Sequence, residues 1–239
     1  MQGALVLFIP VYDYNPLRSI RVQFVTIGLI IANVVIFGLQ VTGGLPLEQV
    51  LAFALVPAQL LSLGALSPGD TAVISGVLIP EQLTPISYMF FHGDIFHLTG
   101  NMLFLWVFGD NVEDALGHFK FLVFYLLCGV AGGLAHAFMM PASTMPLIGA
   151  SGAVAGVIAA YLMLHPRVRV WVLIFRFVPL RITAAFALGA WILTQLVMVM
   201  IPDAGQIARW AHVGGLAAGA LLVLVMRRPG VPLFDRNLA

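Results

Sequence analysis

The sequence predicts an all-α membrane protein, a bundle of six transmembrane helices with a long outer loop between the first and second helices. Two observations lead to this prediction. Of the 239 residues, 61% are hydrophobic and only 9% are charged, which is too little charge to cover a soluble domain of this size. The apolar residues also fall into separate runs, several of them long enough for a helix that crosses a bilayer core of about 30 Å.

Breaks in the apolar pattern set the bounds of each expected helix. The first run follows Arg18 and Arg21 and ends before a Gly-Gly pair and Pro46. Residues 45–95 are apolar but contain five prolines and neither Lys nor Arg, so we expect this loop to lie in or on the outer leaflet, partly as short helices. Residues 166–181 mix arginines with aromatic residues and are expected at the membrane surface. The six helices are predicted at residues 22–39, 97–112, 119–140, 151–164, 182–201 and 210–226.

The basic residues predict an orientation for this bundle. Ten of the eleven Lys and Arg side chains fall on one side of it, and Arg209 falls on the other. By the positive-inside rule both termini are then cytoplasmic, and the protein is expected as a multi-pass protein of a plasma (inner) membrane. The expected organisation is a short cytoplasmic segment, a six-helix membrane domain and a cytoplasmic tail, at residues 1–21, 22–226 and 227–239.

Four polar side chains lie near the outer ends of the second, fourth and sixth helices. They are His97, Asn101, Ser151 and His212. A polar group at membrane depth costs free energy unless it is paired, so such groups are candidates for function. The fourth helix has 14 residues, a length of about 21 Å, so Ser151 is expected several ångströms below the outer surface of a core of about 30 Å.

Small residues indicate that the fourth and sixth helices touch. Gly152 and Gly156 form one small-xxx-small pair, and Gly215 and Gly219 form another; such pairs allow membrane helices to approach closely. If these faces meet, a histidine of the sixth helix comes within hydrogen-bond reach of the serine hydroxyl of the fourth. That arrangement suits a nucleophile and its general base.

An attacking hydroxyl also needs donors for the oxyanion that it creates. Asn101 and His97 lie one turn apart on the second helix and would supply side-chain N–H groups. The backbone N–H of Ser151, at a helix N-terminus, would add another. The active site would then open to the outer face.

Each of these residues also has an ordinary structural explanation when taken alone. Ser151 is a common N-cap residue, and His212 would be a packing histidine. Other chemistries fit the sequence less well: there is no H-E-x-x-H zinc motif, and the run from Gly149 is not a G-x-S-x-G elbow. A small transporter would need polar groups through both leaflets, whereas the inner halves of the helices hold few besides Glu113, which we interpret as holding the turn into the third helix.

Four motifs occur in order along the predicted helices. They are H-G-D-I-F-H-L-T-G-N at residues 92–101, G-x-x-x-E-x-x-x-G at 109–117, G-A-S-G at 149–152, and A-H-V-G-G-L-A-A-G at 211–219. Each motif is weak alone, but the set is specific. In these residues the chain resembles the rhomboid family of intramembrane serine proteases, in its compact six-helix form.

The resemblance implies a function and a role for each candidate residue. Ser151 would be the nucleophile and His212 the general base of a dyad without an acid. Asn101 and His97 would line the oxyanion hole, and the supporting residues would be His92, Gly149, Gly152, Gly215 and Gly219. The substrates would be transmembrane segments of other proteins in the lipid bilayer, admitted by the fifth helix with residues 202–208. No metal, cofactor or nucleic acid is expected, and the sequence does not indicate the oligomeric state.

The sequence departs from the family pattern at two places. Leu83 and Thr84 stand where some rhomboids carry a Trp-Arg pair, and Ala155 stands where some place a tyrosine against the base. Neither departure removes a reacting group. The alternative function, a non-catalytic rhomboid-like binder of client transmembrane helices, would predict loss of Ser151 or His212, and this chain has both.

Overall fold

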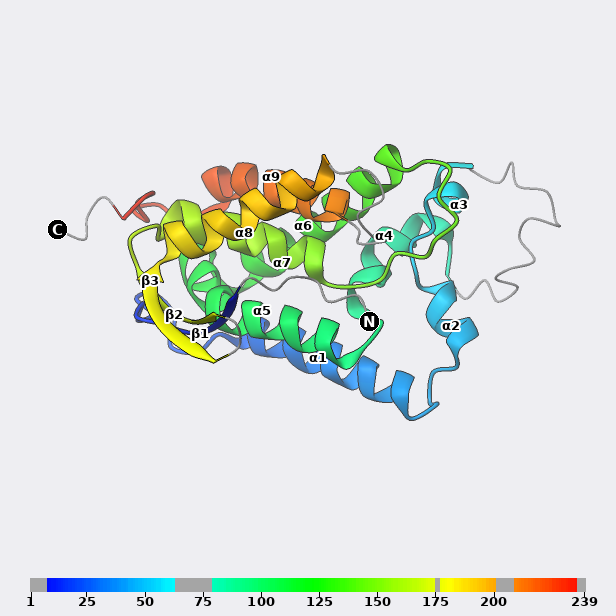
Figure 1. Ribbon diagram of the computed structural model, residues 1–239, viewed down its shortest axis with the longest axis horizontal. Coiled ribbons are helices and arrows are strands. Elements are labelled where there is room, and N and C mark those ends of the chain that lie inside the picture. Colours follow the sequence, from blue (N-terminus) through cyan, green and yellow to red (C-terminus); the bar gives the residue numbers. More distant parts are fainter. Residues whose placement is uncertain (1–7, 63–78, 175–176, 201–208, 236–239) are drawn as a thin grey trace.

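The computed structural model describes residues 8–62, 79–174, 177–200 and 209–235. Long helices lie side by side along the molecule, with a small sheet at one end and short helices at the other (Figure 1). The longer helices are α1 (Phe24–Val41), α5 (Ile95–Leu116), α6 (His118–Met139), α7 (Ser151–Leu164), α8 (Ala184–Val199) and α9 (Arg209–Met226). The mostly helical fold that the sequence predicts is therefore confirmed.

Three helices in the described part of the chain are long and apolar enough to cross a membrane by length and composition. They are α1, α6 and α9, while α7 and α8 are shorter apolar helices. The 22-residue α5 carries Asp110, Glu113 and Asp114 in its last two turns, which lowers its apolar character. The chain is thus a helical membrane protein with at least these three candidate spans.

The all-α prediction missed a three-stranded antiparallel sheet. Its strands are β1 (Phe8–Asp13), β2 (Arg169–Ile174) and β3 (Val178–Thr183), in the order β1-β2-β3. The arginine-rich stretch predicted as a membrane-surface segment forms the β2–β3 hairpin, because Val170 and Val172 alternate with more exposed residues and are fully buried. The pairing of Phe8 with Ile174 joins segments too distant in sequence for a local pattern to reveal.

The loop between α1 and α5 packs into the protein more deeply than the sequence suggested. It contains α2 (Leu47–Ala52), α3 (Pro57–Ser62), α4 (Thr84–Ser87) and the 3-10 turns η2 (Glu81–Leu83) and η3 (Tyr88–Phe90). Tyr88 and Met89 are almost completely buried, and the Tyr88 hydroxyl donates to the Gly129 carbonyl of α6 at 2.8 Å. Apolar side chains and a satisfied hydroxyl thus hold this end of the loop against the bundle, and the short helices that the sequence predicts for the loop are present.

Glu113 does more than hold the turn into α6. Its fully buried carboxylate accepts hydrogen bonds from the backbone N–H groups of Val25 and Thr26, at 3.0 and 2.8 Å, and from the Thr26 hydroxyl at 2.7 Å. It also contacts His118 Nδ1, at the start of α6, at 2.5 Å. Since the N-cap residue of α1, Gln23, makes no side-chain cap, a carboxylate from α5 satisfies that helix end instead.

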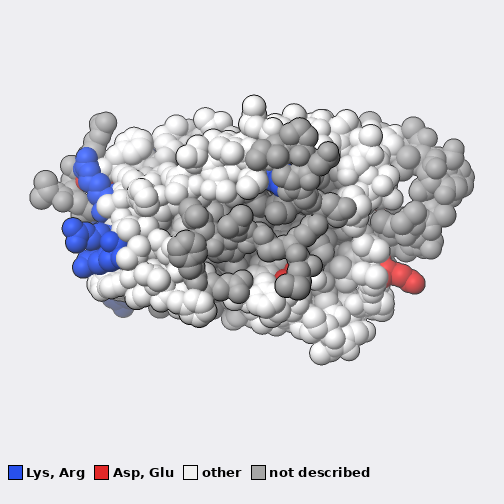
Figure 2. All heavy atoms as spheres, in the orientation of Figure 1, with Lys and Arg blue, Asp and Glu red and all other residues white. Residues whose placement is uncertain are grey.

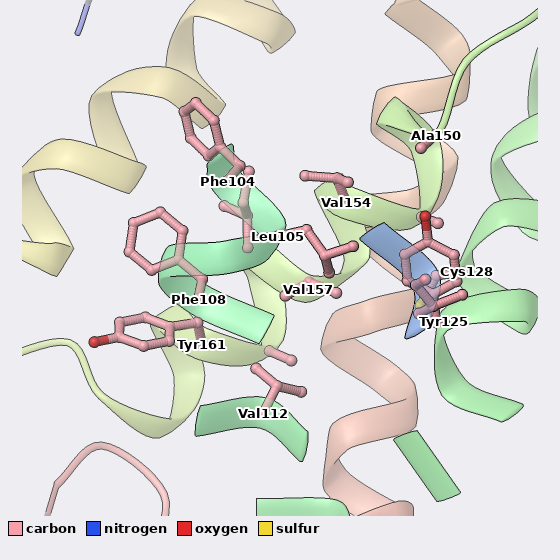
Figure 3. Close-up of a cluster of buried hydrophobic side chains, with 14 of the residues drawn as sticks. Phe104, Leu105, Phe108, Val112, Tyr125, Cys128, Ala150, Val154, Val157 and Tyr161 are labelled. Carbon is pink, nitrogen blue, oxygen red and sulfur yellow. The ribbon is translucent and has the colours of Figure 1, made fainter. Parts of the chain in front are cut away.

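The core lies where α5, α6 and α7 meet (Figure 3). Figure 3 shows aromatic side chains of α5 beside Tyr161 of α7, and valines of α7 facing the side of α6 that carries Cys128. Phe108 and Tyr161 meet edge to face with ring centroids 4.8 Å apart, a favoured aromatic geometry. The body of α7 is thereby fixed against its neighbours, which also fixes the position of its first residue.

A buried carboxyl group joins the sheet to α7 and leads to a pH-dependent prediction. Asp13, at the end of β1, accepts a hydrogen bond from the Tyr161 hydroxyl at 2.5 Å. Burial raises the pKa of Asp13 from 3.8 to about 6, although the hydrogen bond from Tyr161 acts in the opposite direction. Between these two values the folded protein binds more protons than the unfolded chain, so the free energy of unfolding falls as the pH rises through this interval.

Asp13→Asn should reduce this pH dependence, because asparagine keeps the shape of the side chain but does not titrate. The thermal unfolding midpoints of wild type and Asp13→Asn, measured in one detergent from pH 4 to pH 7, test this. We expect the midpoint of the variant minus that of the wild type to increase as the pH rises to about 6. A constant difference between the two proteins across this range would show that Asp13 does not titrate as described.

Candidate active site

The first turn of α7 is shaped by a glycine and a neighbouring histidine ring. Gly149 has a φ of +129°, a conformation that residues with a side chain rarely adopt. A Cβ at Gly149 would also lie 2.5 Å from Cε1 of His97, so the imidazole packs directly on the glycine backbone. This turn places Ala150 at the N-cap position and Ser151 as the first residue of α7.

The structure brings Ser151 and His212 together. Ser151 Oγ lies 2.9 Å from Nε2 of His212, which is 61 residues away in the sequence and belongs to α9. The first turn of α7 has no side-chain cap, so the Ser151 hydroxyl is engaged by the imidazole rather than by its own helix. An imidazole nitrogen at this distance can accept the hydroxyl proton.

Backbone packing of α7 against α9 sets this separation. A Cβ at Gly215 would collide with the carbonyl oxygen of Gly152, and a Cβ at Gly219 would collide with the backbone of Gly156. These glycines allow the two helices to approach more closely than any larger residue would permit. The close approach holds the start of α7 beside His212, in the first turn of α9.

The predicted oxyanion residues lie with His92 against the two residues that precede Ser151, Gly149 and Ala150. Asn101 Nδ2 donates to His92 Nε2 at 3.0 Å, and the Ala150 N–H lies 3.5 Å from the same nitrogen. Both His92 and Asn101 are buried, and the His97 ring lies edge-on to His92 with centroids 5.1 Å apart. Among the described residues, neither Asn101 nor His97 hydrogen bonds to Ser151, so their role in an oxyanion hole stays a prediction.

Sequence analysis missed two residues of α8 that contact His212. Gln195 Oε1 lies 2.7 Å from His212 Nδ1, and the Trp191 ring lies against the imidazole with centroids 5.8 Å apart. Gln195 is the only amide side chain in α8, an otherwise almost wholly apolar helix. The rule that singled out Ser151, a polar group at membrane depth, would therefore have found Gln195 as well. The predicted gate at residues 202–208 lies outside the described residues.

Most of the visible basic side chains lie at one end of the molecule. Figure 2 shows most of the visible Lys and Arg atoms at the sheet end of the molecule, while most of the remaining described surface is uncharged. Ser151 lies at the end of α7 that points away from the sheet (Figure 1). Arg209 is an exception to this distribution, because it lies in the first turn of α9 with His212 and donates to the Met198 carbonyl of α8 at 2.9 Å.

Comparison with known proteins identifies the family. The sequence model of the Rhomboid domain matches residues 80–229, more than half of the chain. The chain is similar to "Rhomboid protein 1, mitochondrial" of Saccharomyces cerevisiae, with 31% identity over 60% of this chain and 41% of that protein. It is also similar to the human "Presenilin-associated rhomboid-like protein, mitochondrial", with 29% identity over 80% of this chain and 45% of that protein. The matched region thus spans less than half of these relatives.

These relatives correct the expected location. The sequence predicted a plasma (inner) membrane with cytoplasmic termini, yet the two relatives above and "RHOMBOID-like protein 12, mitochondrial" of Arabidopsis thaliana, 31% identical over 58% of this chain and 44% of that protein, are mitochondrial by name. They point to a mitochondrial rather than a plasma membrane. The prediction failed because the distribution of Lys and Arg bears on orientation across a bilayer but does not identify the membrane.

The family match includes α5, α6, α7, α8 and α9, and thereby Ser151, His212 and the four glycines between α7 and α9. On this match the chain belongs to the rhomboid family.

Proposed function

We propose that this rhomboid is an intramembrane serine endopeptidase that cleaves transmembrane segments of other membrane proteins in the lipid bilayer. The observation that carries the proposal is the 2.9 Å contact between Ser151 Oγ and His212 Nε2. We further propose that residues 22–226 form one membrane domain, in which the six longer helices all span the bilayer.

The contact suggests a mechanism in which Ser151 is the nucleophile. Its Oγ attacks the carbonyl carbon of the scissile peptide bond while the hydroxyl proton passes to His212 Nε2. The tetrahedral intermediate collapses as the C–N bond breaks, and the imidazolium gives the proton to the leaving amine. Water then attacks the acyl carbon while His212 Nε2 takes one of its protons. The bond between the acyl carbon and Ser151 Oγ breaks, the imidazolium returns that proton to Oγ, and the product acid loses its remaining proton to water and leaves as a carboxylate.

The oxyanion would be stabilised by donors at the start of α7 and on α5. The Ser151 backbone N–H belongs to a helix N-terminus, where amides lack intrahelical partners. Asn101 Nδ2 carries two hydrogens, of which one is used by His92, so the second can serve the oxyanion. His97, held against Gly149, is the further candidate. Preformed donors of this kind stabilise charge that develops in the transition state.

The proposal is tested by turnover of a transmembrane substrate reconstituted with the protein in liposomes. We expect cleavage by the wild type and a loss on the order of 10³-fold or more for His212→Ala, because the hydroxyl then lacks its base. His165→Ala is a matched control, since His165 lies at the opposite end of α7 and bonds to Asp235. Equal turnover by wild type and His212→Ala would contradict the proposed mechanism.

A further inference from the structure

The imidazole of His212 has a polar partner on each of its two nitrogens. Nε2 faces the Ser151 hydroxyl at 2.9 Å, and Nδ1 faces Gln195 Oε1 at 2.7 Å. A neutral imidazole has one donor and one acceptor nitrogen, and a carbonyl oxygen can only accept. The hydrogen must therefore be on Nδ1, which leaves the lone pair of Nε2 directed at the hydroxyl. Gln195 thus selects the tautomer that a general base needs.

The faces of the imidazole ring are also restrained from α8. Trp191, one turn before Gln195, has its ring centroid 5.8 Å from that of His212 and also contacts Phe104 of α5. Trp191 also packs against a small buried cluster formed by Ala155 and Ala159 of α7 and Leu216 of α9. The space that a small residue leaves on α7 is therefore filled from α8.

Few side chains in the C-terminal part of α8, which carries these residues, are buried in the protein. The buried residues of α8 are Ala184, Ala187 and Leu188, all within its first five positions. Beyond them Leu193, Leu196 and Val197 are exposed. Gln195 and Trp191 lie four residues apart and therefore share a face, and that face is the one directed at His212. The C-terminal part of α8 thus contacts α9 through the two side chains that hold the proposed base and through the Met198 carbonyl, which accepts from the Arg209 guanidinium at 2.9 Å.

We propose that Gln195 and Trp191 are positioning residues that α8 supplies to His212, fixing its tautomer and ring orientation for proton transfer from Ser151. The inference rests on the proposed protease function and adds a third helix to the two that carry the reacting groups. Movement of the C-terminal part of α8 away from α9 would release the imidazole. The alignment of His212 with Ser151 therefore depends on the packing of α8.

The experiment compares Gln195→Leu, which removes the acceptor, with Gln195→Glu, which keeps an acceptor oxygen at the same reach. The readouts are the rate of labelling by a fluorophosphonate probe and the kcat and KM for a reconstituted transmembrane substrate. We expect Gln195→Leu to lower the labelling rate and kcat about 10-fold, the scale of one hydrogen bond, with KM unchanged. Gln195→Glu should recover most of the loss.

A matched control separates this role from a general effect on α8. Thr194 is the adjacent residue, and its hydroxyl bonds within the helix to the Ala190 carbonyl. Thr194→Val should therefore label at the wild-type rate. Thermal unfolding of each variant identifies any loss of rate that comes from loss of fold. Full activity of a folded Gln195→Leu protein, or failure of Gln195→Glu to recover activity, would overturn the proposal.

A double-mutant cycle tests whether Trp191 acts through the same imidazole. If both residues hold one ring, the fold-reduction in kcat of the double variant, Trp191→Leu combined with Gln195→Leu, should be smaller than the product of the two single fold-reductions. Independent, multiplicative losses would contradict the shared role. A wild-type protein that neither cleaves substrate nor reacts with the probe would instead refute the proposed function, and the positioning role with it.

Discussion

Replacing Ser151 with alanine should abolish proteolysis, with a fall in turnover on the order of 10³–10⁶-fold. The change removes the oxygen that His212 Nε2 faces at 2.9 Å, and no other hydroxyl is hydrogen bonded to that histidine in the described residues. Because the first turn of α7 makes no side-chain cap, alanine costs the helix no capping bond, and alanine has the higher helix propensity. The loss of turnover should therefore come from the chemical step, in a protein that is still folded.

Turnover of a reconstituted transmembrane substrate measures this effect, with thermal unfolding as the check on folding. Ser143→Ala is the matched control, because the Ser143 hydroxyl lies in the exposed loop before α7 and bonds to Met145 of that loop. The control should cleave at the wild-type rate. Retention of wild-type turnover by a folded Ser151→Ala protein would remove the nucleophile from the mechanism.

Replacing Gly215 with alanine should cost both stability and activity. The added Cβ would collide with the carbonyl oxygen of Gly152, and a backbone atom cannot turn aside as a flexible side chain can. We expect α7 and α9 to separate locally, with a loss in the free energy of unfolding of about 1–3 kcal/mol. A displacement of about 1 Å between catalytic groups can cost about 100-fold in rate, so kcat should fall even at temperatures where the variant is folded.

Gly28→Ala provides the control for a glycine-to-alanine change in a membrane helix. Gly28 belongs to α1, and a Cβ there meets no atom within 4 Å. Its stability and turnover should stay close to those of the wild type. If Gly215→Ala behaved like Gly28→Ala in both measurements, the close approach of α7 and α9 would not set the geometry of the site.

The sequence predicts most where a local pattern carries the information. Apolar runs placed the longer helices within a few residues of their observed bounds, and the run after Gly149 gave α7 as residues 151–164 without error. Small-residue spacing on α7 and α9 anticipated the contact that brings Ser151 to His212. These features follow from helical periodicity and from the requirement for small residues at close helix contacts.

The features that escaped prediction depend on partners distant in sequence. The partner of β1 is β2, more than 150 residues away, so nothing near Phe8 reveals the sheet. Glu113 was recognised as structural, but its main partners belong to the start of α1. Gln195 stood out in the sequence as a polar residue of an apolar helix, but its contact with His212 did not, because only the packed helices bring the two side chains together.

The most direct test of the central claim is to identify the residue that a fluorophosphonate probe modifies. The labelled wild-type protein would be digested and its modified peptide sequenced by mass spectrometry. Our account predicts one adduct, on Ser151 Oγ, whose formation is suppressed by His212→Ala. An adduct on a different side chain of an active protein, or equal labelling of Ser151 with and without the histidine, would contradict it.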